Sequence, residues 1–315
     1  MEYRKLGNSG LEVSLAGLGC NNFGMRTSEP DSAAVVNAAL DEGINFFDTA
    51  DIYGGGRSEE FLGRALGSRR HEAVIATKFG IPTGQGPNQG GGSRRYAITS
   101  CEKSLTRLGT DYIDVYLLHM PDPTTPIEET LDAMNQLVDQ GKVRYLGCSN
   151  LRAWQIADAD WTARDRGLRG FVTAQNEWSL LERSSEAEVV PACERFGLGI
   201  MPYFPLAGGA LTGKYKRGEA FEQTSRFGTS EARSGMFGHF VSDASLTRVE
   251  QLDRVAGEVG LSLLELALSW LASRPVVSSV IAGATRPEQV KSNVASTRSN
   301  LGSEVFEAVE RALTG

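Results

Sequence analysis

The sequence predicts a (β/α)8 barrel, a closed ring of eight parallel strands in which a helix follows each strand. Eight short apolar runs recur along the 315 residues, mostly about thirty residues apart, the length of a strand–helix repeat. Several runs are almost continuously apolar, as expected for strands covered on both faces. Because no change of composition interrupts the repeats, we expect a single domain spanning residues 1–315. The runs start near Leu15, Ile44, Val74, Ile113, Val143, Phe171, Gly199 and Ser279.

An additional element precedes the first repeat, and two long segments interrupt the rhythm. Residues 3–6 and 11–13 flank Gly7-Asn8-Ser9-Gly10, which predicts a β-hairpin that covers one end of the barrel. Residues 80–93 are rich in Gly, Gln, Asn and Pro, and residues 214–245 are polar and dotted with Gly. Both segments follow strands, so we expect long loops at the C-terminal face of the barrel, where active sites of such barrels lie.

Three helices have boundaries that the sequence marks clearly. One is predicted from Glu59 to Leu66 and another from Thr99 to Leu108, and each is followed directly by a glycine. A third is predicted from Pro126, with Thr125 as its N-cap and Gly141 at its end. These helices alternate with the apolar runs, as a (β/α)8 barrel requires.

Composition and charge exclude several classes of protein. The formal net charge of -7 argues against a general nucleic-acid-binding protein, and the 41% of hydrophobic residues is ordinary for a globular chain. The four cysteines and three histidines show no metal-ligand spacing, so no metal site is expected. No run of about 18 apolar residues appears, so we predict a cytoplasmic protein without a membrane association. The sequence indicates nothing about the oligomeric state.

Four side chains of complementary chemistry lie just beyond three of the predicted strands. Asp48 and Tyr53 share a Gly-rich turn after the second strand, Lys78 closes the third, and His119 follows the fourth. A tyrosine alone is a poor acid, but a neighbouring ammonium lowers its pKa, and a carboxylate keeps that ammonium charged. A histidine directed at the same oxygen helps to polarise it. Together the four predict the proton-donating half of a site that reduces a carbonyl by hydride transfer.

Each of these residues also has an ordinary structural explanation. Asp48 fits a helix cap, Tyr53 a half-buried aromatic, Lys78 a surface charge and His119 a hydrogen-bonded core residue. Their joint placement at the mouths of consecutive strands favours the functional interpretation. Asp51, within the same turn, is interpreted as a turn or capping residue.

Two nucleotide-binding motifs are not supported by their context. Residues 208–214 match the start of a P-loop, but Tyr215 stands where a Ser or Thr would bind Mg²⁺. No G-x-G-x-x-G opens a helix after the first predicted strand, so a doubly wound dinucleotide fold is not indicated.

Long ordered motifs along nearly the whole chain, to about Asn293, resemble those of the aldo-keto reductases, a family of NAD(P)H-dependent (β/α)8 barrels. The resemblance implies that Tyr53 is the general acid, that Lys78 and Asp48 tune it, and that His119 orients the carbonyl. The motifs are F-D-T-A-D-I-Y-G at 47–54, A-T-K-F-G at 76–80, S-L-T-R-L-G-T-D-Y-I-D-V-Y-L-L-H at 104–119, G-K-V-R-Y-L-G-C-S-N at 141–150, A-Q-N-E-W-S-L-L at 174–181, P-Y-F-P-L-A-G-G-A-L-T-G-K-Y at 202–215 and I-A-G-A-T-R-P-E-Q-V-K-S-N at 281–293.

The same resemblance implies a site for NADPH. Ser149, Asn150 and Gln175 would hydrogen-bond the nicotinamide carboxamide, and the ring of Tyr203 would stack on the nicotinamide. Arg286, at the start of the last barrel helix, would bind the 2′-phosphate. The full set of implied cofactor contacts is Gly19, Cys20, Asn21, Ser149, Asn150, Gln175, Tyr203, Phe204, Pro205, Leu206, Gly208, Gly213, Lys214, Gly283, Thr285, Arg286, Gln289 and Asn293.

Three positions depart from the family pattern. Phe204 follows the stacking aromatic where Ser is expected, Ala282 replaces a common Pro, and Ser292 replaces an acid that would contact the adenine. The last change predicts altered contacts to the adenosine, and none of the three touches the four catalytic candidates.

The resemblance implies a small-molecule carbonyl substrate, whose identity the sequence does not indicate. Asn22, Phe23 and Trp178 are predicted to form walls of the substrate pocket, although loop anchoring explains each of them equally well. A second function stays open, because some barrels of this family act mainly as NADPH-sensing partners of membrane channels.

Overall fold

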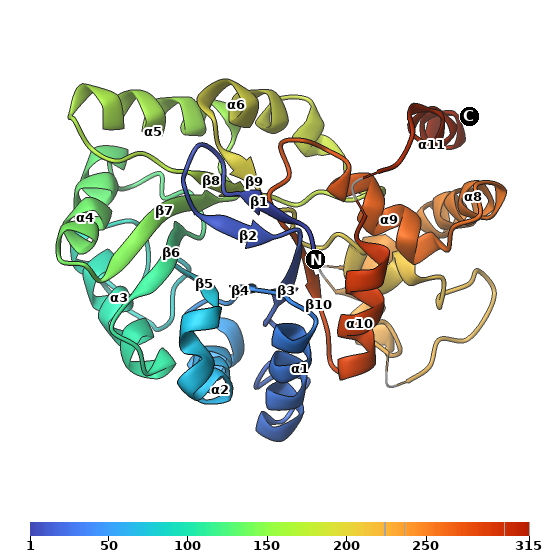
Figure 1. Ribbon diagram of the computed structural model, residues 1–315, viewed down its shortest axis with the longest axis horizontal. Helices are drawn as coiled ribbons and strands as arrows, with labels where there is room; N and C mark the ends of the chain where they lie inside the picture. The colour runs from blue at the N-terminus through green and yellow to red at the C-terminus, as the bar shows by residue number, and fades with distance from the viewer. Residues whose placement is uncertain (224, 236, 299, 315) are drawn as a thin grey trace.

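The architecture is a parallel barrel surrounded by helices (Figure 1). It is seen in a computed structural model that describes residues 1–223, 225–235, 237–298 and 300–314. Thr224 and Met236, within the second predicted loop, and Gly315 lie outside the described residues. The barrel strands are β3 (Ala16–Gly19), β4 (Phe46–Asp48), β5 (Val74–Phe79), β6 (Ile113–Leu118), β7 (Val143–Ser149), β8 (Thr173–Gln175), β9 (Gly199–Ile200) and β10 (Val280–Gly283).

Neighbouring strands pair in parallel in the order β10-β3-β4-β5-β6-β7-β8-β9. The remaining gap between β9 and β10 is bridged by backbone hydrogen bonds. Ile200 N donates to Val276 O over 2.8 Å, Ser278 N donates to Ile200 O over 2.9 Å, and Ile281 N donates to Pro202 O over 3.2 Å. The predicted (β/α)8 barrel is therefore confirmed, and the carboxyl ends of its strands meet at one rim.

An N-terminal hairpin covers the opposite end of the barrel. Strand β1 (Tyr3–Lys5) pairs antiparallel with β2 (Glu12–Ser14), as predicted, and Figure 1 shows both strands across the near end of the barrel. Leu6 and Val13 are fully buried and pack with Phe46 and other interior barrel residues. The hairpin thus seals the end that lies away from the rim.

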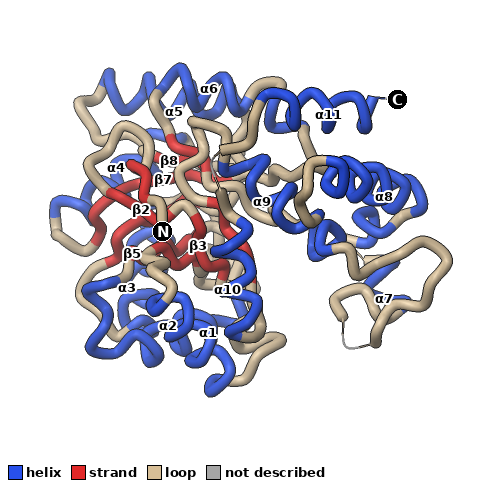
Figure 2. The backbone as a smooth tube through the Cα atoms, turned by 45° about the vertical axis from the view of Figure 1, so that its right-hand side comes forward, coloured by secondary structure: helices blue, strands red, loops and turns tan. Residues whose placement is uncertain are grey.

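Helices form the outer layer around the strands, in blue in Figure 2. Among the described residues, no single helix is long and apolar enough to cross a membrane; α8 and α9 meet that length and composition only as a pair bent by 87°. The helices are α1 (Glu29–Asp41), α2 (Arg57–Leu66), α3 (Arg94–Leu108), α4 (Ile127–Asp139), α5 (Ala153–Asp165), α6 (Val189–Phe196), α7 (Ser230–Ser234), α8 (Asp243–Glu258), α9 (Leu263–Ala272), α10 (Pro287–Ser296) and α11 (Ser303–Thr314).

The three helix predictions have correct ends but imperfect starts. Helix α3 begins five residues before Thr99, because Ser93 Oγ accepts a hydrogen bond from Tyr96 N and caps the helix earlier. Thr125 is not the cap of α4. Pro126 takes that position without a side-chain bond, and the Thr125 hydroxyl donates to Asp122 instead.

The two long loops lie on the rim side of the barrel. The first joins β5 to α3 and spans residues 80–93, as predicted. The second follows β9 and contains α7 and the short turn Gly238–Val241. Helix α8 begins at Asp243, so the last three residues of the predicted loop 214–245 belong to this helix. Figure 2 shows this second segment, with α7, projecting from the body of the molecule. Both loops contribute to the cavity described next.

Candidate active site

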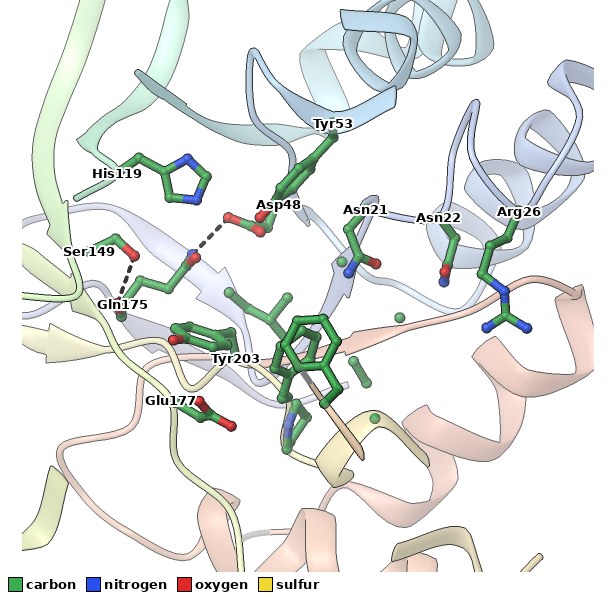
Figure 3. Close-up of a pocket in the computed structure, with 18 of the residues that line it drawn as sticks. Asn21, Asn22, Arg26, Asp48, Tyr53, His119, Ser149, Gln175, Glu177 and Tyr203 are labelled. Carbon is green, nitrogen blue, oxygen red and sulfur yellow. Dashed lines mark hydrogen bonds between the residues drawn. The ribbon is translucent and has the colours of Figure 1, made fainter. Parts of the chain in front are cut away.

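One large cavity opens at the rim formed by the carboxyl ends of the strands. Its volume is ≈ 1920 Å³, enough for a dinucleotide together with a small substrate. Residues after all eight barrel strands line it, and both long loops add to its walls. Figure 3 shows some of these lining residues, with Tyr53, His119 and Tyr203 among those labelled. The sequence-predicted residues that line it are Gly19, Asn21, Asn22, Asp48, Tyr53, His119, Ser149, Asn150, Gln175, Tyr203, Phe204, Pro205, Leu206, Gly208, Lys214, Gly283, Thr285, Arg286, Gln289 and Asn293.

The buried ammonium of Lys78 joins the carboxyl group of Asp48 and the phenol of Tyr53. Lys78 Nζ donates to Asp48 Oδ2 over 2.8 Å, to Thr49 O over 2.7 Å and to Tyr53 Oη over 3.3 Å. The Lys78 side chain is 0% exposed and that of Asp48 is 5% exposed. Strands β4 and β5 are neighbours in the barrel, which brings these groups together although they lie far apart in sequence.

Burial and neighbouring charges shift the pKa values of Lys78 and Tyr53 in opposite directions. Burial would lower the pKa of Lys78, but Asp48 and Tyr53 together raise it above its usual value, so the ammonium stays charged. Burial raises the pKa of the Tyr53 phenol and outweighs the lowering by Lys78. The ammonium of Lys78 does lower the pKa of Tyr53, as predicted, but it only limits the increase that burial causes. Tyr53 is therefore protonated at neutral pH.

His119 stands beside the phenol as a neutral imidazole. Its ring meets that of Tyr53 edge to face, with centroids 5.9 Å apart. Burial, with a further contribution from Lys78, lowers the pKa of His119 to about 3. Its Nδ1 is buried and has no hydrogen-bond partner within the described chain. A neutral ring can donate one hydrogen bond toward a substrate oxygen in the cavity without adding charge.

Polar side chains at the carboxyl ends of β7 and β8 hold this centre in place. Gln175 Nε2 donates to Asp48 Oδ1 over 2.7 Å, and Ser149 Oγ donates to the Gln175 carbonyl over 2.9 Å (Figure 3). Asn150, with a left-handed φ of 61°, donates to the His119 carbonyl over 3.0 Å and accepts from Tyr203 Oη over 2.8 Å. These bonds fix the strand ends relative to one another, so the four catalytic candidates are held from both sides.

At the far end of the cavity the backbone and the charges suit an anion. The turn after β9 holds Phe204, Ala207, Gly208 and Gly209 at φ of 52°, 48°, 65° and 103°, which brings the main chain close to the cavity. The arginine and lysine side chains that line the cavity are Arg26, Lys214, Arg226 and Arg286.

Two of these cations repel each other. Burial and then the charge of Arg26 lower the pKa of Arg226, whose Nη2 lies 3.4 Å from Asn22 Oδ1. An anion between two such guanidinium groups would relieve that repulsion. Our sequence interpretation did not single out Arg226 or Arg26. The sequence gives little indication of their role, since each is a single basic residue in an irregular loop.

Helix α10 points its N-terminus into the same region. Arg286 is its exposed N-cap residue and Pro287 its first residue. Gln289 Oε1 accepts from Thr285 N over 2.7 Å and orders the turn before the helix. A helix N-terminus with an adjacent guanidinium is favourable for phosphate. The described residues contain no group of three or more His, Cys, Asp or Glu placed to hold a metal ion.

Several predicted contacts do not reach the cavity. Cys20 and Gly213 do not line it, and Lys78 lies behind it. Phe23 and Trp178, predicted as substrate walls, are buried in the hydrophobic core at 0% and 1% exposure. The prediction for both is corrected: an aromatic side chain near a strand end also packs well inside. Apolar cavity residues that were not predicted include Ile81, Met120 and Pro121.

A comparison with family models decides the class of this chain. The model described as the aldo/keto reductase family matches residues 16–314, nearly the whole sequence. The chain belongs to the aldo/keto reductase family. Membership of that family supports an oxidoreductase that acts on carbonyl compounds.

Several known proteins resemble the chain along most of its length. A probable voltage-gated potassium channel subunit beta of Oryza sativa subsp. japonica is 41% identical over 93% of this chain and 90% of its own. An uncharacterized oxidoreductase of Bacillus subtilis is 36% identical over 100% of this chain and 97% of its own. The L-glyceraldehyde 3-phosphate reductase of Escherichia coli is 33% identical over 93% of this chain and 87% of its own. Proteins with different names are thus similar to this chain.

Proposed function

We propose that this aldo/keto reductase reduces an aldehyde or ketone to an alcohol with NADPH, and that Tyr53 is the general acid. The observation that supports this most is the contact of Lys78 Nζ with both Asp48 and Tyr53 at the floor of the cavity. A protonated phenol beside a buried ammonium is a proton donor whose conjugate base is stabilised as it forms.

Each catalytic candidate has a distinct task in the proposed reaction. When bound, NADPH supplies the hydride that the carbonyl carbon accepts. Tyr53 Oη gives its proton to the developing alkoxide, and the Lys78 ammonium stabilises the resulting phenolate. Asp48 keeps Lys78 charged and directed at the phenol. The neutral imidazole of His119 orients the substrate oxygen.

The cavity fits NADPH at both ends. Tyr203 presents an aromatic ring beside Asn150 and the catalytic group, where a nicotinamide would stack. Lys214, Arg226 and Arg286 supply positive charge toward the other end, where the pyrophosphate and the 2′-phosphate would bind. These residues would hold the cofactor, and the space near Met120 would remain for the carbonyl substrate.

Replacement of Tyr53 by Phe tests the proposed reaction. We expect kcat to fall by about 10²- to 10⁴-fold across a panel of aldehydes, because a positioned acid contributes that much. NADPH consumption measures turnover, and NADPH fluorescence shows whether binding persists. Tyr3→Phe is the matched control, since Tyr3 lies on the hairpin at the other end of the barrel. Wild-type turnover in the Tyr53→Phe variant would refute the assignment.

Replacement of Arg286 by Ala tests the cofactor preference. The change should raise the KM for NADPH by about tenfold or more and leave that for NADH nearly as it is, since only NADPH carries the 2′-phosphate. Steady-state kinetics with both cofactors measure this, with Arg248→Ala on α8 as a control for the loss of an exposed arginine. Equal effects on the two cofactors would argue against a phosphate contact at this position.

A second function is favoured by the names of two relatives. Probable potassium channel beta subunits from two plants are each 41% identical to this chain. A channel-associated subunit with the same cavity would bind NADPH but turn over slowly. Turnover of a simple aldehyde at an ordinary enzymatic rate would favour the reductase. Very slow turnover, together with co-purification of a membrane partner, would favour the alternative.

A further inference from the structure

A second group of charged side chains, formed by two buried acids and a partly buried arginine, lies beside the turn that carries Tyr53. Glu59, at the start of α2, is fully buried; its carboxylate accepts from Thr77 Oγ1 and, over 2.6 Å, from Arg107 Nε. Thr77 precedes Lys78 on β5, so the hydrogen bond to Glu59 fixes the strand next to Lys78. Arg107 reaches this group from α3.

The same group supports the turn that carries Tyr53. Three glycines follow Tyr53, and all have left-handed φ values, so the turn has few side chains of its own to hold it. The Arg107 side chain packs so closely against Gly56 that a Cβ there would lie 2.8 Å from Arg107 Cδ. Asp51 N also donates to the Lys78 carbonyl over 3.3 Å. The turn and the lysine strand are therefore braced from behind.

Asp51 is the unusual member of this arrangement. Its side chain is 5% exposed, and neither carboxyl oxygen has a hydrogen-bond partner in the described part of the chain. The amide N–H of Ile52 favours the charged form but is not placed to donate a full hydrogen bond. A buried carboxylate without donors is strongly unfavourable, whereas the protonated acid carries no net charge.

The charges around Asp51 also favour its protonated form. Glu59 of α2, Arg107 of α3 and Lys78 of β5 act on it electrostatically, and Asp51 in turn acts on the Tyr116 phenol of β6. Arg107 is already paired with Glu59, and Lys78 with Asp48. Two cations thus face three carboxyl groups, and the unpaired acid is the one without hydrogen bonds.

We propose that Asp51 is a positioning residue that is protonated in the active form of the site, and that its ionisation weakens proton donation by Tyr53. This inference rests on the proposed reductase function. On ionisation the Asp51 proton leaves for solvent and a negative charge remains behind Lys78. That charge disfavours the phenolate that Tyr53 must form when it donates its proton. Burial, with the charge of Glu59, raises the pKa of Asp51 to about 7, so the change falls within the working range of pH.

The pH dependence of kcat in three proteins tests the proposal. In the wild type, kcat for aldehyde reduction should fall about tenfold from pH 6 to pH 8. Asp51→Asn, a neutral isostere, should retain turnover at pH 6 and lose this decrease. Glu59→Gln should move the decrease to lower pH, because it removes the negative charge and leaves Arg107 to pair with Asp51. Asp111→Asn, on the exposed surface, is the control.

Either of two kinetic results would overturn the proposal. One is a decrease of kcat in Asp51→Asn at the same pH as in the wild type. The other is loss of turnover at pH 6 in a folded Asp51→Asn protein that still binds NADPH, since the active form would then need the anion.

A spectroscopic measurement keeps the test independent of turnover and of the variant's folding. Wild-type protein labelled with ¹³C in the Asp carboxyl groups should show one protonated Asp carboxyl at pH 6 by NMR or infrared spectroscopy, ionising near neutral pH. Asp51→Asn should lack that signal. A wild-type spectrum in which every Asp is ionised at pH 6 would refute the inference. If Tyr53→Phe kept full turnover while this signal was present, the proposed function would fail and the buried acid would stand.

Discussion

At the scale of single residues, the site is built from groups whose charges are set by their neighbours. Lys78 is fully buried, and its three donated bonds go to Asp48, Thr49 and Tyr53. A buried ammonium is stable only when it is paired in this way. The same pairing aims the charge at the phenol, so stability and the proposed chemistry depend on one contact.

Replacement of Lys78 by Met should therefore impair both properties. We expect kcat to fall by about 10²-fold or more, because the phenolate loses its stabilising charge. The free energy of unfolding should fall by about 3–5 kcal/mol, because Asp48 is left buried without its partner. Turnover assays and urea unfolding measure the two effects. Lys142→Met is the matched control: its surface pair with Glu102 is worth about 0–1 kcal/mol. Equal losses in both variants would contradict this account.

The four catalytic candidates were predictable because polar groups directly after apolar strands must meet at one rim of a parallel barrel. Asp51 was predicted to be a turn or capping residue; it does lie in a turn, but its carboxyl caps nothing. Its environment comes from α2 and α3, whose packing no local pattern reveals. Phe23 and Trp178 were wrongly predicted as cavity walls, because sequence does not distinguish a rim aromatic from a core aromatic.

At the scale of elements, one carboxylate organises the cavity's most Gly-rich wall. Asp122, in the loop after β6, accepts hydrogen bonds from Gly92 N over 2.8 Å, Thr124 N over 2.9 Å and Thr125 Oγ1 over 2.7 Å. Burial alone would raise the pKa of Asp122, but a hydrogen bond from the Thr124 hydroxyl, together with these three donors, lowers it to about 2. The residue joins loop 80–93 to the segment that follows His119.

Asp122→Asn should loosen loop 80–93. The variant should be cut there faster by a protease of broad specificity, because a neutral amide cannot accept all these bonds as strongly. In the wild type the depressed pKa means that this stabilisation is complete above the usual aspartate value and is lost as the pH falls through about 2. Asp158→Asn, exposed on α5, is the control. Unchanged cleavage of loop 80–93 would show that other contacts hold it.

Element ends were easier to predict than element starts. Gly67 and Gly109 follow α2 and α3 directly, and Gly109 takes the left-handed conformation that favours glycine after a helix. The start of α3 depends on Ser93, one of several polar residues in a long loop, so the cap was not recognisable. Thr125 resembled a cap but binds Asp122, a partner that only the folded loop supplies.

At the scale of the whole molecule, the two ends of the barrel have separate roles. The rim carries the cavity, while the hairpin seals the other end with Leu6 and Val13 inside the barrel. This division was predictable from eight repeats preceded by a short hairpin pattern. That residues 1–315 form a single domain, and that the protein is cytoplasmic, remain predictions.

Leu6→Ala tests this division of roles. Loss of a fully buried leucine should lower the free energy of unfolding by about 2–5 kcal/mol. The kcat at a temperature where the variant is folded should stay near that of the wild type, because the hairpin lies at the end of the barrel away from Tyr53. Chemical denaturation and turnover measure the two. Trp154→Ala, which removes a side chain that is 62% exposed, should change stability by only about 0.5 kcal/mol. A large loss of kcat in folded Leu6→Ala would contradict the separation.

The central claim is that Tyr53 donates a proton during reduction of a carbonyl with NADPH. Its most direct test is a single turnover, in which protein loaded with one equivalent of NADPH is mixed with excess aldehyde and followed by absorbance. We predict that the wild type consumes the bound NADPH, whereas Tyr53→Phe binds it equally well and consumes it at least about 10²-fold more slowly. Consumption at the same rate by both proteins would contradict the account.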